Sequence, residues 1–324
     1  MRNNWLYILL AVLLSTSCQH DTELPLVRLV ECAAMPFPVV ASSSFTYHNS
    51  VYLFGGRTAD GQHTNNLWQY DTSNDEWILL CQAPMKARVS SSACVIGDCA
   101  YIGMGYSGKV HCDTSYLRDF WKYDFTTREW KRLADFPANT TVKNCLFSTE
   151  DAIYAVYGFY RQFTRDVYRY DIITNQWKQL NSTSTLYVPR AMDVVGATCQ
   201  DRYFFGTGFN HGSLRFWVEW IPEEQQFVSR KNILGPGRNA AVCCATNEHI
   251  YLAGGRHYGD TLTTGFFFNS IERYAPVLDS WEYVGSMPYE AENMVAASIQ
   301  GQVFIGLGEM VNGDIRNNWY RIEE

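Results

Sequence analysis

The sequence predicts an all-β fold built from six copies of one four-stranded unit. Aromatic residues make up 15% of the chain and charged residues only 18%, a composition that favours pleated sheets over charge-rich helices. One phrase, formed by residues 51–57, residues 67–71 and Trp77, recurs along the 324 residues. Its apolar runs are short and separated by polar turns, which indicates strands.

Each copy begins with a strand of small residues, turns on a polar pair and continues into a second strand that ends in glycine. In the first copy the turn falls at His48 and Asn49, and the second strand runs into Gly55 and Gly56. The first and second strands are expected at residues 43–47 and 51–56, 92–96 and 99–105, 144–148 and 152–158, 194–198 and 202–208, 241–245 and 250–255, and 295–299 and 303–308.

An aromatic third strand and a fourth strand that opens with an aromatic residue complete the unit. The third strands are expected at residues 67–71, 120–124, 167–171, 217–220, 271–274 and 318–320. The fourth strands open at Trp77, Trp130, Trp177, Phe227 and Trp281, which are 53, 47, 50 and 54 residues apart. We expect these aromatic side chains to fill the space between neighbouring sheets rather than to carry chemistry.

The sixth copy lacks a fourth strand, and the beginning of the chain supplies a matching segment. Residues 26–35 align with residues 76–85, so that Met35 falls on Met85 and Cys32 lies within one position of Cys81. We therefore predict that residues ~26–32 form the outer strand of the last unit and close the six units into a ring. Such closure removes two exposed sheet edges and makes residues 26–324 one domain.

With its paired glycines, Tyr-Asp ends and tryptophans at this spacing, the segment 26–324 resembles a six-bladed kelch-type β-propeller. The resemblance implies four-stranded blades around a central channel, with the first strand of each blade innermost. Three copies carry Gly-x-Gly instead of Gly-Gly, and the third has Tyr157 before Gly158. The fourth replaces the tryptophan with Phe227 and lacks Tyr-Asp.

The first 17 residues follow the pattern of an export signal. Arg2 precedes a ten-residue apolar run at 5–14, which is too short to span a bilayer comfortably, and small residues lead directly to Cys18. This order resembles a bacterial lipobox, in which the cysteine is lipidated. An ordinary secretory signal is the alternative. The expectation is a lipid-anchored protein of the bacterial cell envelope, with residues 18–25 as a tether.

No motif predicts a metal, a cofactor or hydrolysis. Nine cysteines follow Cys18, but their spacing fits neither a disulfide framework nor a C-x-x-C site, and most lie in apolar strands as small hydrophobes. No Lys-Ser/Thr follows the glycines, and neither G-x-S-x-G nor H-E-x-x-H occurs. A net charge of −7 without basic runs argues against nucleic-acid binding.

The two ends of the predicted ring differ in composition. The turns within each unit are short and mostly acidic, whereas the second-to-third-strand loops and the links between units are longer and richer in arginine, histidine and asparagine. We expect binding at the loop end, because loops held by a rigid scaffold commonly carry sites, and arginine there suits carboxylates and phosphates. The expected ligand-binding residues are Arg57, Arg88, Asn144, Arg190, Arg238, Arg256 and His257.

Arg88 and Arg238 stand at equivalent positions before the innermost strands, with Arg190 near the same register, so we expect them around the mouth of the channel. The favoured function is a monomeric, non-catalytic binding module for an acidic sugar, a glycan or a protein partner. A looser resemblance, to exported sialic acid mutarotases (N-acetylneuraminate epimerases), implies acid–base chemistry with Glu309 and Glu292 as candidate catalytic groups. A pure assembly scaffold is the third possibility.

Overall fold

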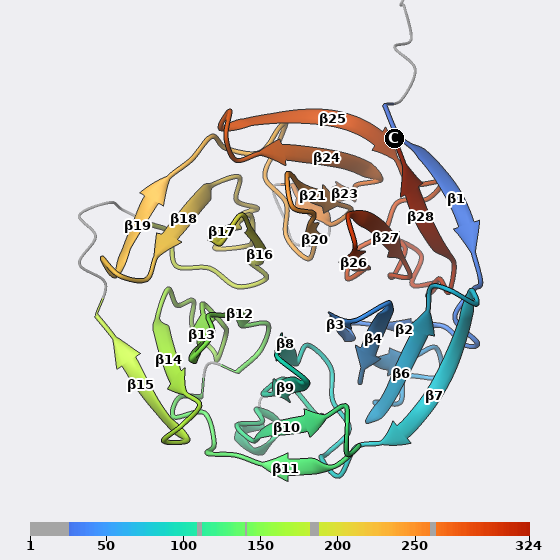
Figure 1. Ribbon diagram of the computed structural model, residues 1–324. Coiled ribbons are helices and arrows are strands. Elements are labelled where there is room, and N and C mark those ends of the chain that lie inside the picture. Colours follow the sequence, from blue (N-terminus) through green and yellow to red (C-terminus); the bar gives the residue numbers. More distant parts are fainter. Residues whose placement is uncertain (1–25, 109–111, 140, 182–187, 260–263) are drawn as a thin grey trace, which may run out of the picture.

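The computed structural model describes residues 26–108, 112–139, 141–181, 188–259 and 264–324. In these residues six four-stranded antiparallel sheets are arranged as blades around a central channel, as Figure 1 shows. The predicted all-β, six-bladed propeller is confirmed. Among the described residues no helix is long and apolar enough to cross a membrane, and the predicted signal segment and Cys18 lie outside them.

Within blades 1 to 5 the four main strands follow chain order from the channel outward. Blades 1 and 2 consist of β3 (Ser43–Tyr47), β4 (Ser50–Phe54), β6 (Asn66–Asp71) and β7 (Glu76–Gln82), then β8 (Ser92–Ile96), β9 (Cys99–Gly103), β10 (Phe120–Asp124) and β11 (Trp130–Arg132). Blades 3 and 4 consist of β12 (Cys145–Ser148), β13 (Ala152–Val156), β14 (Val167–Asp171) and β15 (Gln176–Leu180), then β16 (Val195–Cys199), β17 (Arg202–Gly206), β18 (Trp217–Ile221) and β19 (Gln226–Ser229).

Blade 5 contains two additional strands in its loop. Its main strands are β20 (Val242–Ala245), β21 (Ile250–Ala253), β24 (Ser270–Ala275) and β25 (Ser280–Ser286), and the loop between the second and third forms the hairpin of β22 (Arg256–Tyr258) and β23 (Gly265–Phe267). A smaller pair, β2 (Val39–Val40) and β5 (Arg57–Thr58), joins the link into blade 1 to the loop of that blade.

Blade 6 joins the beginning of the described chain to its end. Its strands are β26 (Val295–Ile299), β27 (Gln302–Gly306), β28 (Trp319–Glu323) and β1 (Arg28–Cys32). β1 pairs antiparallel with β28, from Arg28 opposite Glu323 to Cys32 opposite Trp319. The predicted closure by the N-terminal strand is therefore confirmed, and Figure 1 shows β1 running along the outer side of β28.

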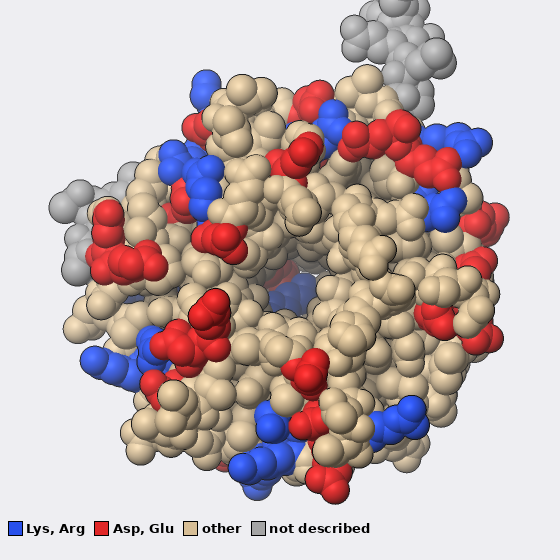
Figure 2. Space-filling view, viewed as in Figure 1, with Lys and Arg blue, Asp and Glu red and all other residues tan. Residues whose placement is uncertain are grey.

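The six innermost strands consist largely of small residues because they converge on one axis. Each contacts the innermost strand of both neighbouring blades, which closes the inner ring. Ser44, Ala93, Ala197 and Ser298 are among the side chains that line a channel cavity of about 500 Å³. Figure 2 shows this channel as a hollow at the centre of the molecule, with a basic side chain in its depth.

The aromatic residues of the repeat fill the space between blades, as predicted. Tyr70, Tyr170 and Tyr274 are almost completely buried. The Trp77 indole donates a hydrogen bond to the Ala33 carbonyl at 2.9 Å, and the same bond recurs two blades further on and again in blade 5. Because each accepting carbonyl belongs to the end of the preceding blade, these indoles connect neighbouring blades.

The end of each second strand adopts a left-handed backbone over two consecutive residues. The second of the two is glycine in every blade, whereas the first is Met104, Tyr157, Thr207 or Leu307 in four of them. A Cβ on Gly105 would lie 2.7 Å from the Val89 carbonyl oxygen, so this second position excludes a side chain. In the Gly-x-Gly copies the first glycine is the last residue of the second strand, and the middle residue takes the left-handed conformation.

Candidate functional site at the channel mouth

Six equivalent backbone bridges surround the mouth of the channel at the loop end. In each blade, the residue after the left-handed pair bridges to the link residue three positions before the innermost strand. Val89 and Tyr106 illustrate the geometry, because each N–H donates to the other's carbonyl, at 2.8 and 2.9 Å. The six bridges are Val40–Arg57, Val89–Tyr106, Val142–Phe159, Met192–Phe209, Asn239–Arg256 and Glu292–Glu309.

The composition of the bridges divides the mouth into two halves. In blades 2, 3 and 4 every bridging residue is apolar or aromatic, and we name this the aromatic half. In blades 5, 6 and 1 the bridges include two arginines and two glutamates, and we name this the charged half. One opening therefore presents two chemically different surfaces side by side.

Glu292 is the least satisfied carboxylate of the charged half. Burial raises its pKa, while the nearby positive charges of Lys143 and Arg256 lower it. No described residue donates a hydrogen bond to this carboxylate. Its neighbour Glu309 instead forms an ion pair with Arg57 at 2.6 Å, which joins blade 6 to blade 1.

Arg256, on strand β22, lies near Glu292, and His257 follows it on the same strand. The Arg256 guanidinium stacks over the Tyr258 ring, 4.3 Å from its centroid. The His257 Nδ1 lies 2.7 Å from the Gly237 carbonyl oxygen, which holds the imidazole against the link into blade 5. The fold thus brings Arg57 and Arg256 to the charged half of the mouth, together with both candidate acids, whereas the imidazole of His257 contacts the link into blade 5.

One residue further along each link, an inner ring narrows the channel. All six members have a left-handed backbone, and they are Ala41, Ser90, Lys143, Asp193, Ala240 and Asn293. The Lys143 Nζ forms an ion pair with Asp193 at 2.7 Å and donates to the Asn293 Oδ1 at 2.8 Å. Residues of this ring line a cavity of about 180 Å³, smaller than the one along the innermost strands.

Sequence reasoning did not single out Lys143 and Asp193 as partners. A signal was available, because both stand two residues before an innermost strand, and that register places them on one ring. Their mutual contact could not be predicted, because it depends on how two successive blades converge on the channel.

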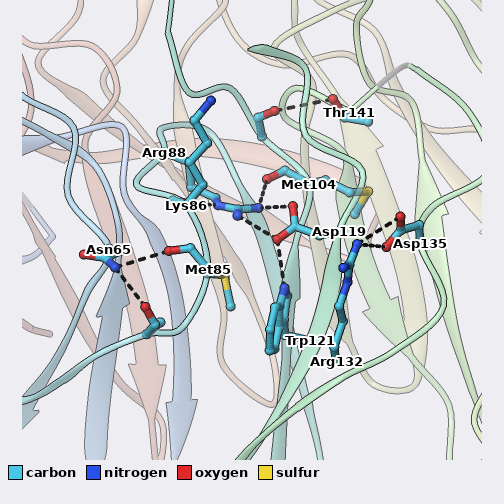
Figure 3. Close-up of polar contacts among 12 residues, drawn as sticks. Asn65, Met85, Lys86, Arg88, Met104, Asp119, Trp121, Arg132, Asp135 and Thr141 are labelled. Atoms are coloured by element: carbon cyan, nitrogen blue, oxygen red, sulfur yellow. Dashed lines mark hydrogen bonds and ion pairs between the residues drawn. The ribbon is translucent and has the colours of Figure 1, made fainter. Parts of the chain in front are cut away.

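Arg88 does not line the mouth, which corrects the expectation drawn from its register. Its side chain is fully buried, and the two Nη atoms each donate to one Asp119 carboxylate oxygen at 2.8 Å. It also donates to the Met104 and Lys86 carbonyls. Figure 3 shows this network, in which the Trp121 indole donates to the same carboxylate. The guanidinium is thereby committed to bracing the loop of blade 2.

Arg238 occupies the equivalent interior position in blade 5 and is corrected for the same reason. It is 1% exposed, forms an ion pair with the buried Glu272 and stacks on the Phe268 ring at 3.9 Å. At this register the arginine side chain enters the space between the link and the third strand, where it forms an ion pair with a buried or half-buried carboxylate. Neither guanidinium can therefore offer donors to a ligand in this structure.

The two remaining predicted residues have opposite environments. Asn144 is buried, and its side-chain amide donates to the Tyr157 carbonyl at 2.8 Å, so it braces the loop of blade 3. Arg190 is exposed on the link into blade 4, and its own carbonyl accepts a hydrogen bond from Asn210. Neither belongs to the charged half.

Aromatic contacts connect the loops of the aromatic half. The Tyr116 ring packs edge-on against Tyr160 with centroids 4.8 Å apart, which links blades 2 and 3. Phe163 contacts Phe209 at 6.1 Å, which links blades 3 and 4. Sequence reasoning overlooked these residues because it assigned aromatic side chains to the interior.

The described part of the chain contains no group of three or more His, Cys, Asp and Glu residues that could hold a metal ion. The nine cysteines from Cys32 to Cys244 are free thiols. Burial raises the pKa of Cys94, Cys243 and Cys244, so these thiols behave as small hydrophobic side chains.

Blades closed by an N-terminal strand and loops gathered at one channel mouth define the class of protein, a β-propeller with a single elaborated face. Sequence comparison then identifies the family. Residues 19–208 match the model described as the KLHDC2/KLHL20/DRC7 Kelch-repeats domain, and residues 237–288 match the Kelch motif. The chain belongs to the Kelch-repeat family.

Several curated proteins are similar over much of the chain. Kelch-like protein terF of Aspergillus terreus (strain NIH 2624 / FGSC A1156) is 23% identical over 290 residues, which cover 87% of this chain and 52% of that protein. Kelch-like protein 25 of Xenopus tropicalis is 25% identical over 270 residues, which cover 81% and 43%. The chain spans about half the length of these relatives.

Proposed function

We propose that this protein is a non-catalytic binding module that holds a protein partner at the mouth of its channel. The observation that carries the proposal is the ring of six bridges, which gathers side chains from all six blades around one opening with an aromatic and a charged half. Aromatic anchors beside fixed charges are typical of protein interfaces. Membership of the Kelch-repeat family supports it, because such propellers commonly act as protein-interaction scaffolds.

Chemistry on a carboxylated sugar has less support. The mutarotase resemblance needs arginines that are free to hold the carboxylate, but Arg88 and Arg238 are buried in ion pairs. Arg57 is paired with Glu309, and burial raises the pKa of Glu292, the other candidate acid. A lone acid without a substrate-binding partner does not define a catalytic site.

Affinity capture with matched variants tests the binding proposal. The full chain is immobilised as wild type, with Arg57→Gln and Tyr160→Ser at the mouth, or with Ile173→Ser and Val277→Ser, which alter exposed turns at the opposite end. Quantitative mass spectrometry should recover a protein that the wild type and the turn variant retain and the mouth variant loses at least fivefold. Equal recovery by all three chains would contradict the proposal.

Export and lipid anchoring at Cys18 are a separate proposal, supported by the apolar run and the small residues before that cysteine. The relatives reported above come from a fungus and a frog, so a bacterial cell envelope rests on the N-terminal pattern alone. Expression of the full chain with a labelled fatty acid should mark the wild type but not a Cys18→Ala variant. Equal labelling, or none in either chain, would reject this proposal.

A further inference from the structure

In every blade, one side chain connects the loop to the link that follows the blade, and we call this side chain the brace. The brace always stands two residues before the first buried residue of the third strand. The brace donates a hydrogen bond to a carbonyl of the link that leaves the blade. Blades 1, 5 and 6 use asparagine, and the bonds are Asn65 to Ala83 at 2.8 Å, Asn269 to Met287 at 3.3 Å, and Asn317 to Met35 at 2.8 Å.

Blades 2, 3 and 4 use arginine for the same brace. The bonds are Arg118 Nε to Phe136 at 2.7 Å, Arg165 Nη1 to Val188 at 3.0 Å, and Arg215 Nη2 to Ile233 at 3.2 Å. Asparagine makes the same hydrogen bond in blades 1, 5 and 6. The need for a brace therefore does not explain why blades 2, 3 and 4 have arginine at this position. Each arginine uses one nitrogen for the hydrogen bond of the brace and retains further N–H donors.

These three arginines form a basic arc along the aromatic half. All three are exposed, and no carboxylate of the described residues lies within ion-pair distance of them. Arg57, Arg88 and Arg238 are by contrast each paired with a carboxylate. In a chain with a net charge of −7, three unpaired arginines on three successive blades are a local exception to the acidic surface.

An aromatic surface accompanies the basic arc. Tyr116 lies two residues before Arg118 in the chain and contacts Tyr160 of the next blade. Phe163 lies two residues before Arg165 and contacts His211 of blade 4 at 5.4 Å. The loops that carry the arginines are therefore joined by ring contacts from blade 2 to blade 4.

We propose that the basic arc docks an acidic segment of the protein partner. Asp or Glu side chains of that segment would pair with Arg118, Arg165 and Arg215, because guanidinium groups bind carboxylates through paired N–H donors. An apolar side chain between them would rest on Tyr116, Tyr160 and Phe163. The opposite half of the mouth carries Glu292 and Glu309, whose charges favour a short acidic segment over a long polyanion that would cross the opening.

This inference rests on the proposed function and specifies the chemistry of the partner. A phage-displayed library of random dodecapeptides, selected on the full chain, supplies the probe. We expect the enriched peptides to contain several Asp or Glu residues beside an aromatic residue. Synthetic copies with Gln and Asn in place of the acids should bind at least tenfold more weakly in fluorescence anisotropy. Higher ionic strength should lower the affinity of the chain for the acidic peptides.

The decisive variant replaces all three arginines by asparagine, which blades 1, 5 and 6 show to preserve the brace. Arg118→Asn/Arg165→Asn/Arg215→Asn should keep its melting temperature and lose at least tenfold in affinity for the acidic peptides. Arg28→Gln/Lys131→Gln/Lys178→Gln, which removes three positive charges from outer strands, should lose less than twofold. This control separates the arc from a general charge effect.

Five outcomes would overturn the inference. The first two are enriched peptides that are neutral or basic, and enriched peptides that bind the asparagine variant unchanged. A heparin oligosaccharide or a single-stranded oligonucleotide that binds the arc more tightly than the peptides would assign it to another polyanion. Enriched peptides lost from Arg57→Gln but not from the arc variant would refute the arc while leaving the binding function intact, whereas the absence of any enriched peptide, together with no partner in the capture experiment, would refute both.

Discussion

At the scale of single residues, backbone conformation separates the repeat positions that tolerate variation from those that do not. The first residue of the left-handed pair accepts methionine, tyrosine, threonine or leucine, all with φ between 58° and 63°. The second accepts only glycine, because the backbone of the incoming link occupies the space of a Cβ. Repeated glycines therefore record close contact between a loop and a link, and not a ligand site.

Substitution of Gly105 tests this distinction. Gly105→Ala should lower the free energy of unfolding by about 3 kcal/mol, because its Cβ would meet Val89 O at 2.7 Å and Ser91 N at 2.9 Å in a left-handed backbone. Gly97→Ala is the control, since Gly97 is also left-handed but has no atom within 4 Å of the added carbon, and it should cost about 1 kcal/mol. Denaturant unfolding measures both, and equal losses would contradict the steric explanation.

Glu292 should make stability depend on pH. Burial raises its pKa above the ordinary value of 4.5, against the opposing effect of Lys143 and Arg256. The folded protein therefore binds this proton more tightly than the unfolded chain does, so the ionised group costs stability once the pH exceeds the folded pKa, and costs nothing below the unfolded pKa. Glu292→Gln should raise the melting temperature by about 2 °C at pH 8 and by nothing at pH 4.

Calorimetry at the two pH values provides the measurement for Glu292→Gln. Glu248→Gln, in an exposed turn, should leave the melting temperature unchanged at both. A lower melting temperature for Glu292→Gln at pH 8 would show that the carboxylate stabilises the mouth.

At the scale of elements, every second blade is joined to the blade before it by a set of three hydrogen bonds, which we call the latch. In blade 1 the Asp75 Oδ1 accepts from the Tyr70 hydroxyl at 2.6 Å and from the Ala33 N–H of the preceding blade at 2.8 Å. The Trp77 indole completes the latch by donating to the Ala33 carbonyl. The same arrangement recurs in blades 3 and 5, with Asn175 and Asp279 as the acceptors.

Blade 2 provides an internal control for the latch. Its equivalent turn residue is Arg128, which shares the left-handed conformation of Asp75 but whose side chain forms no hydrogen bond with a described residue. Asp75→Ala should lower the free energy of unfolding by about 2 kcal/mol through two lost hydrogen bonds, and Arg128→Ala by less than about 0.5 kcal/mol. If chemical denaturation gives similar losses for both, the latch contributes nothing.

At the scale of the whole molecule, ring closure depends on a strand from the opposite end of the sequence. β1 covers the outer edge of β28, and without it that edge would be free to pair with other chains. Removal of residues 1–32 should lower the melting temperature by roughly 10 °C and cause concentration-dependent self-association. Removal of residues 1–25 should change neither, and light scattering with thermal unfolding would reveal a failure of this prediction.

The extent of successful prediction follows from the repeat. Because the unit is repeated six times at regular spacing, the sequence predicts the strands and the position of residues such as Trp77 between blades. The repeat also shows that the sixth copy lacks a fourth strand, which residues 26–32 supply. The site was predicted less well. Arg57 and Arg256 were assigned to the binding end, and both belong to backbone bridges at the mouth, whereas Arg88 and Arg238 were assigned to the same end and are buried in ion pairs. Arg88 and Arg238 share one register in the links, but that register alone did not reveal their burial, which depends on the space that the fold leaves between the link and the third strand.

The sequence by itself determined the blades, their number, the closing strand and the end of the ring with the elaborate loops, because all of these follow from local patterns repeated about every 50 residues. Only the tertiary structure decided which charges remain available. It pairs Lys143 with Asp193 and Arg88 with Asp119, while it leaves Arg118, Arg165 and Arg215 exposed. The physical reason is that exposure and ion pairing depend on the distances between blades. These distances are determined jointly by residues that lie far apart in the chain.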